Sequence, residues 1–297
     1  MSNKSSIASL VLLGILVFPV SSIAAADNCQ SFLLSNGNMH IPIEIEGEEY
    51  SAAITTNNIP AAISQGLVDV LGLKERINPN LRIVSDTGRD RVFRYVTGLP
   101  VNLFGLDTNI EELAIVGDDS LYLTISLRIF SGLLVQINFP EKKICFLSRD
   151  SIDLRSAQNI QMDSSAASGT PVVFLTLNDE FDTWLDFQPA LSIGLRVDRF
   201  VASQLLLETT KSTANAESDF SLGVIDNLTF GPYELGNIPI QFPKSGVRSN
   251  LTERQQTLTD TAIQKDRKSR GALGIDVLEH FIITMDLELE RMHIFAP

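Results

Sequence analysis

The sequence predicts a mainly β protein in which one structural plan is used twice. Apolar and polar residues alternate over residues 39–45, as in a strand with one buried face, and the alternation returns over residues 173–177. The ends of the two halves also match. Shifting residues 126–147 by 274 − 126 = 148 places eleven apolar positions on apolar positions. Two matches in the same order indicate an internal duplication.

Composition and charge exclude several classes of protein. The chain has 297 residues, 44% of them hydrophobic, which is enough for one large domain or two ordinary ones. Its formal net charge of -13 leaves no basic face to neutralise phosphates, so we expect no nucleic-acid partner. His40, His280 and His293 are scattered without the spacing of a zinc site. We therefore expect neither a metal nor a cofactor.

Residues 1–26 have the pattern of a signal peptide. Lys4 precedes an apolar run over residues 7–20, and Ala24-Ala25-Ala26 offers a cleavage site before Asp27. The run is shorter than the roughly 20 residues that a membrane span needs. We expect an exported protein, periplasmic or secreted, whose mature chain does not span a membrane.

The chain contains two cysteines, Cys29 and Cys145, and both belong to the mature chain. In an oxidising compartment they would be able to form a disulfide that ties the start of the first half to its last strand. The alternative is two unpaired cysteines, one near the terminus and one buried. The sequence leaves both open, since it does not give the separation of the two Cα atoms.

The first half, residues 27–147, is expected to begin with two strands joined by a turn at residues 46–49. The further elements expected are a helix at 61–73, a hairpin at 81–95, strands near 99–103 and 112–116, and a closing helical turn and hairpin at 126–147. The hairpin carries Asp86-Thr87-Gly88 at its tip, where Asp and Gly suit turn geometry.

A polar, serine-rich linker is expected at residues 148–169, and the plan restarts in the second half, residues 170–297. The further elements expected are a turn at 178–180, a strand at 181–185, a helix at 190–207, strands at 224–230 and 238–242, and a closing segment at 271–295. The polar insertion at residues 243–270 has no equivalent in the first half. It is either a solvated segment or a docking loop.

Two segments near the C-terminal end of the second half resemble a known family. Ala272-Leu273-Gly274-Ile275-Asp276-Val277-Leu278 and Ile283-Thr284-Met285-Asp286-Leu287 resemble the closing segments of a retropepsin-type aspartic protease domain, of the kind found as tandem pairs in exported bacterial proteins. Residues 61–73 resemble the helix after that family's catalytic loop. The resemblance implies two pepsin-type β-barrel halves related by a pseudo-two-fold axis, each with a short helix. It also implies a monomer with pseudo-dimeric architecture.

The resemblance further implies where the catalytic residues would lie. In such a protease each half supplies Asp-Thr-Gly; the two aspartates share a proton, and the threonines brace the two loops. By distance from the preceding turns, Thr55-Thr56-Asn57 takes these positions in the first half and Asp186-Phe187-Gln188 in the second. A threonine hydroxyl cannot replace a carboxylate as a base. We therefore expect Asp186 to lack its partner, and the other five residues to contact a ligand.

Three functions follow as hypotheses. The first is a catalytically degenerate protein that binds an extended peptide in the cleft between its halves. The second is an active aspartic endopeptidase that uses Asp186 with an unrecognised partner, such as Asp86. The third is a structural interaction module whose contact surface is the insertion at residues 243–270. In each case the partner is a peptide or protein.

Overall fold

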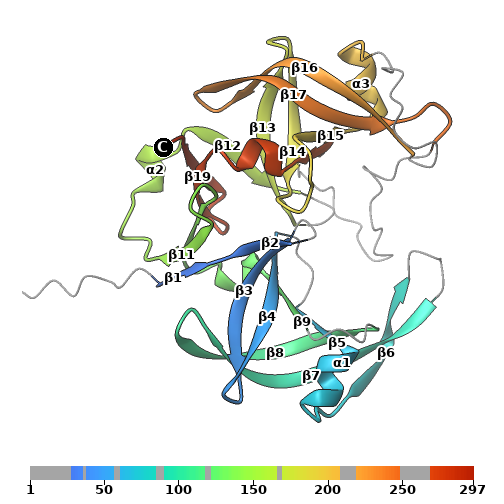
Figure 1. Cartoon of the computed structure of the whole chain (residues 1–297), viewed down its shortest axis with the longest axis vertical. Coiled ribbons are helices and arrows are strands. Elements are labelled where there is room, and N and C mark those ends of the chain that lie inside the picture. Colours follow the sequence, from blue (N-terminus) through green and yellow to red (C-terminus); the bar gives the residue numbers. More distant parts are fainter. Residues whose placement is uncertain are drawn as a thin grey trace, which may run out of the picture.

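The computed structural model describes residues 28–35, 38–56, 61–84, 90–117, 122–165, 169–207, 219–247 and 268–297. The expected signal peptide, Asn57, Asp86-Thr87-Gly88 and most of the insertion at 243–270 lie outside these residues. Within them, two β-rich halves are joined by a shared sheet (Figure 1).

The first half is a closed barrel of six strands in the order β3-β4-β9-β5-β8-β7, closed by pairing between β3 and β7. The bounds are β3 (Asn38–Ile45), β4 (Glu48–Thr55), β5 (Ala62–Ser64), β7 (Asp90–Leu103), β8 (Leu106–Val116) and β9 (Tyr122–Ser126). The short helix α1 (Gln65–Val70) follows β5. Strands β2 (Leu33–Ser35) and β6 (Arg76–Val84) extend the sheet beyond the barrel on β3 and β7.

The second half is a closed six-stranded barrel of the same design, in the order β13-β14-β18-β15-β17-β16. The bounds are β13 (Pro171–Leu177), β14 (Phe181–Phe187), β15 (Leu195–Val197), β16 (Phe220–Phe230), β17 (Tyr233–Pro243) and β18 (Gly271–Leu273), with helix α3 (Arg199–Gln204) after β15. The parallel pairs β4–β9 and β5–β8 recur as β14–β18 and β15–β17. The predicted fold class is therefore confirmed: the protein is mainly β and consists of two equivalent barrels.

A six-stranded sheet joins the barrels in the order β1-β11-β10-β19-β20-β12. The bounds are β1 (Asn28–Ser31), β10 (Leu134–Asn138), β11 (Lys143–Leu147), β12 (Ile160–Ser164), β19 (Ile282–Asp286) and β20 (Arg291–Phe295). The 3-10 helix η1 (Leu127–Phe130) leads into β10, and helix α4 (Ile275–Leu278) leads into β19. One continuous apolar core runs through both barrels and this sheet, so the halves fold against each other.

Two expected helices are much shorter than the sequence suggested. At 61–73 only Gln65–Val70 is helical, and at 190–207 only Arg199–Gln204 is. Ser64 and Asp198 cap the two helices, each accepting a hydrogen bond from the backbone N–H three residues on. The apolar residues before each cap lie in buried strands, β5 and β15, because they complete the barrels.

The segment expected to be a linker is structured in its described part. Residues 148–165 contain helix α2 (Leu154–Ala157) and strand β12. β12 pairs first with β20 and then with β13, so it belongs to both the shared sheet and the second barrel. It is the counterpart of β1, which occupies the opposite edge of the shared sheet.

Candidate functional site

The ends of β4 and β14 meet between the two barrels. Thr56 follows β4 and is 5% exposed. Its hydroxyl donates a hydrogen bond to the backbone carbonyl of Phe187, at the end of β14, over 2.9 Å. Gln188, the next residue, donates its backbone N–H to Leu273 of β18. A side chain of the first half thus holds the loop of the second, where the sequence predicted that the two halves meet.

Strand register shows which residues of the two loops are equivalent. Ser126 caps η1 and Gly274 precedes α4, and these two residues are 148 apart, the shift found from the sequence. Thr55 pairs with Ser126 in the parallel ladder of β4 and β9. In the matching ladder of β14 and β18, Phe187 pairs with Leu273. The next residues of the two segments, Gln188 and Gly274, therefore occupy the places that Thr55 and Ser126 occupy in the first barrel. The counterpart of Thr55 is therefore Gln188.

The predicted equivalence of Thr55 and Asp186 is wrong by two residues. Asp186 pairs with Ala272, and the matching pair in the first barrel is Ala53 with Thr124. The error arose at the turns. Residues 48 and 49 were assigned to a four-residue turn because both are glutamates, but they are paired in β4, which leaves a two-residue turn. The second barrel has three residues, 178–180, at this place.

Neither residue of the equivalent pair carries a carboxyl group. Thr55 Oγ1 is buried and has no hydrogen-bond partner in the described part of the chain. Gln188 is half-buried. Its carboxamide donates and accepts hydrogen bonds but does not ionise. The pair can bind polar groups, and it cannot share a proton between two acids.

Asp186 points away from the core, because its neighbours Leu185 and Phe187 are buried in it. Its Oδ1 atom is buried without a partner within the described residues. Burial raises the pKa of Asp186 to about 6, since it disfavours the charged carboxylate, and a hydrogen bond with Ser269 acts in the opposite direction. Asp186 is thus a desolvated acid beside the loop.

The structure places only some of the remaining predicted site residues. The Phe187 side chain is fully buried in the core, where its ring lies 6.5 Å from that of Phe139, so only its backbone faces the junction. Asn57 lies outside the described residues. The hairpin predicted around residues 81–95 is present as β6 and β7, which pair from Arg76–Tyr95 to Val84–Asp90. Its tip, Asp86-Thr87-Gly88, falls in the part that is not described.

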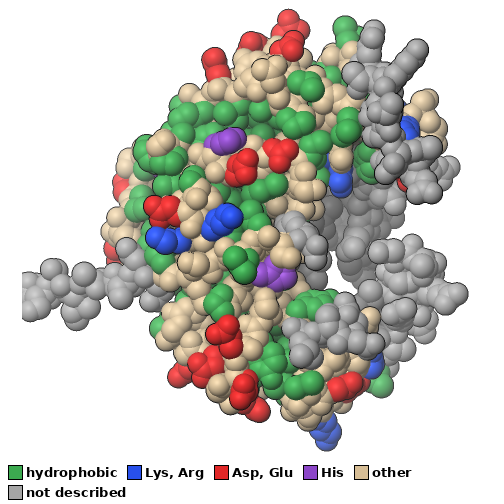
Figure 2. Space-filling model, in the orientation of Figure 1, with side chains coloured by type: hydrophobic (Ala, Val, Ile, Leu, Met, Phe, Trp, Pro, Cys, Tyr) green, Lys and Arg blue, Asp and Glu red, His purple; other side chains and the backbone are tan. Residues whose placement is uncertain are grey.

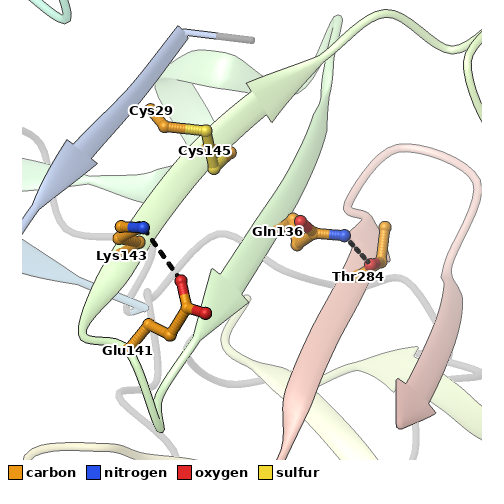
Figure 3. Close-up of a disulfide and its surroundings, with 6 residues drawn as sticks. All are labelled: Cys29, Gln136, Glu141, Lys143, Cys145 and Thr284. Atoms are coloured by element: carbon orange, nitrogen blue, oxygen red, sulfur yellow. Dashed lines mark hydrogen bonds and ion pairs between the residues drawn. A yellow bond between two sulfur atoms is a disulfide. The ribbon is translucent and has the colours of Figure 1, made fainter. Parts of the chain in front are cut away.

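Cys29 and Cys145 form a disulfide with an S–S distance of 2.00 Å (Figure 3). They lie directly opposite each other on β1 and β11, with Cα atoms 4.0 Å apart. The bond closes a loop with a sequence separation of 116 residues, which covers almost the whole first half. It therefore fixes the outer strand of the shared sheet.

Among the described residues, no three His, Cys, Asp or Glu side chains lie close enough together to hold a metal ion. No helix in that part of the chain is long and apolar enough to cross a membrane.

No family model matches the chain, and no curated protein is similar to it. Among solved structures, the chain is similar to a retropepsin-like aspartic protease from Rickettsia conorii. The likeness covers 46% of this chain and 87% of that protein, with 13% sequence identity and a TM-score of 0.30.

Proposed function

We propose that this chain is an exported, catalytically inactive protein of the retropepsin-like type that binds an extended peptide between its two barrels. The observation that carries the proposal is the structural equivalence of Thr55 and Gln188 in the two barrels. These residues occupy equivalent places where the resemblance calls for two aspartates. The contact from Thr56 to the carbonyl of Phe187 matches the bracing role that the resemblance assigns to threonine.

The absence of carboxyl groups from this pair accounts for the proposed inactivity. Water attack on a peptide bond in this mechanism needs one ionised and one protonated acid side by side at the scissile bond. A hydroxyl and a carboxamide do not supply these protonation states at any pH at which the protein is folded. Thr55 and Gln188 can still hydrogen-bond a peptide backbone.

Peptide binding is supported by a strand edge without a ladder partner in the described part of the chain. β6 pairs only with β7 among the described ladders, so one edge of it faces away from the barrel. An extended peptide can add to such an edge through backbone hydrogen bonds.

Export is supported by two features. Residues 1–26 have the charge and hydropathy pattern of a signal peptide. The disulfide between Cys29 and Cys145 is of the kind that persists in oxidising compartments.

Peptide binding can be tested with the mature chain and a library of unstructured peptides, recovered by affinity selection. Hydrogen exchange should then show slower exchange of the β6 amides when peptide is bound. Gln188→Arg should weaken binding at least tenfold, because it places a bulky charge at the loop junction. Gln204→Arg, an exposed change on α3, should leave binding unchanged. Equal binding by both variants, or no retained peptide, would overturn the proposal.

One observation favours the alternative of an active endopeptidase. Asp186 is a buried acid whose pKa is raised to about 6, and raised carboxyl pKa values are common in catalytic acids. Its counterpart in the other barrel, however, is Ala53. The interaction-module alternative rests on residues 243–270, most of which lie outside the described residues.

A further inference from the structure

The outer face of the second barrel carries an open depression of about 640 Å³, within the usual range for ligand sites. It forms where β12 leaves its partner in the shared sheet and joins the barrel. Gln161 pairs with Arg291 of β20, whereas Met162 pairs with Val173 of β13. The sheet bends at this step and leaves a concave surface. The residues lining it include none of those at the loop junction, so the site is separate from the proposed peptide cleft.

An aromatic pair forms one wall of the depression. Phe174 and Trp184 lie directly opposite each other on β13 and β14, with ring centroids 5.5 Å apart and an interplanar angle of 62°. Both side chains are half-buried and point out of the barrel, because their neighbours Leu175 and Leu185 fill the core. The rings therefore present aromatic surface toward the hollow.

The barrel does not need this aromatic pair in order to close. In the first barrel, Pro42 and Ser51 face each other on β3 and β4 at the positions equivalent to Phe174 and Trp184. That barrel closes with the same six-stranded order although no aromatic residue stands at either position. The two halves share their architecture and differ here, so the aromatic pair calls for an explanation other than folding.

The charges around the rings favour a cation. Among the described residues that line the depression, Asp163 and Glu290 are acidic and none is lysine or arginine. A third carboxylate, on Asp182, lies two residues before Trp184 and accepts a hydrogen bond from Thr176 in the lining over 2.7 Å. The faces of aromatic rings attract cations, most strongly for tryptophan. The aromatic rings, the acidic rim and the net charge of -13 each favour the binding of a cation, and acidic side chains are spread over the face drawn in Figure 2.

We propose that this depression binds an organic cation, an ammonium or guanidinium group seated against Trp184 with Asp163 and Glu290 at its rim. Such a group can come from a lysine or arginine side chain of a partner protein or from a small free amine. The proposal does not depend on the peptide cleft or on the loss of the aspartate pair.

The chain contains a single tryptophan, so its fluorescence reports on this site without a label. The mature protein is titrated with tetramethylammonium, with acetyl-lysine amide, and with the same lysine compound acetylated on its side chain, which removes the charge. The charged probes should give a saturable change that weakens with added salt, and the uncharged form should bind at least tenfold more weakly. A lysine compound that binds more tightly than tetramethylammonium would identify a side chain as the source; the reverse order would identify a free amine.

Variants make the test specific. Asp163→Asn and Glu290→Gln keep the side-chain size and should each weaken binding of the charged probe several-fold. Glu112→Gln, an exposed change on the first barrel, should leave it unchanged. Phe174→Leu should also weaken binding while retaining the reporter. A response of equal strength to the uncharged probe or to methyl glucoside, a neutral ligand that also stacks on tryptophan, would overturn the proposal. So would the absence of a saturable response to either charged probe.

Discussion

Gln136 and Thr284 lie opposite each other at the centre of the shared sheet, and the Nε2 atom of Gln136 donates a hydrogen bond to Oγ1 of Thr284 over 3.0 Å (Figure 3). They are also equivalent residues of the two halves, since 284 − 136 = 148. A residue that pairs with its own counterpart lies on the axis relating the halves. The pseudo-two-fold axis therefore passes between Gln136 and Thr284.

Breaking this axial hydrogen bond should destabilise the protein modestly. Gln136→Met and Thr284→Val each remove one partner at nearly constant volume, and each should lower the free energy of unfolding by about 1 kcal/mol. The double variant should cost less than the sum of the two, with a coupling energy of about 1 kcal/mol in urea unfolding. Strict additivity would show that the two side chains do not interact.

Removing the disulfide should have a larger effect. A separation of 116 residues between Cys29 and Cys145 predicts that replacing both by serine lowers the free energy of unfolding by about 4–5 kcal/mol, because the unfolded chain gains freedom. A reducing agent should destabilise the natural chain and leave the double serine variant unchanged. Equal urea midpoints for the natural and variant chains would contradict this role.

Thr56 should matter for its hydroxyl and not for its size. Thr56→Val leaves the carbonyl of Phe187 without its buried donor and should lower the free energy of unfolding by about 1–3 kcal/mol. Thr56→Ser retains the hydroxyl and should restore most of the loss. If valine and serine are equally destabilising in chemical unfolding, the contact does not brace the two loops.

Asp186 should make stability fall as pH rises. Its pKa in the folded protein is about 6 against an ordinary value of 3.8, so between these values the folded protein binds more protons than the unfolded chain. The carboxyl should therefore lower the free energy of unfolding progressively from about pH 4 to above pH 6, by up to about 3 kcal/mol.

Asp186→Asn should remove this dependence. The variant should be more stable than the natural chain at about pH 8, and its advantage should shrink as the pH falls through about 6 and be lost near about pH 4. Asp226→Asn, a change at an exposed position, serves as the control. An advantage of Asp186→Asn that is equal at both pH values would show that the carboxyl is not desolvated in the folded protein.

The internal duplication was the feature that the sequence predicted most directly. The shift of 148 residues found from apolar positions alone reproduces the pairing of β10 with β11 as that of β19 with β20, residue for residue. The pattern was visible because both hairpins are buried in one shared sheet and keep the same alternation. Closed barrels with equivalent strand orders follow from that repeat.

The loop residues were harder to place, because charge misled the alignment. Glu48 and Glu49 look like turn residues but are paired in β4, where they are exposed to solvent beside the turn of the hairpin. Counting them as turn moved the aspartate position from Gln188 to Asp186. Gln188 was identified only from the strand register, through the pairing of Thr55 with Ser126 and of Phe187 with Leu273.

The aromatic depression could not be predicted from spacing along the chain. The site combines side chains from β12, β13 and β14 with Glu290, which follows β19. It becomes visible only when the bend of β12 brings these strands around one hollow.

The central claim is that the equivalent pair Thr55 and Gln188 has replaced a catalytic pair of acids. The most direct measurement is peptide cleavage by the mature protein, with a diverse peptide mixture from about pH 3 to about pH 7, beside Asp186→Asn. We expect no cleavage above the uncatalysed background from either protein, together with retained peptide binding. Cleavage by the natural chain that disappears in Asp186→Asn would contradict the account and identify Asp186 as a working catalytic acid.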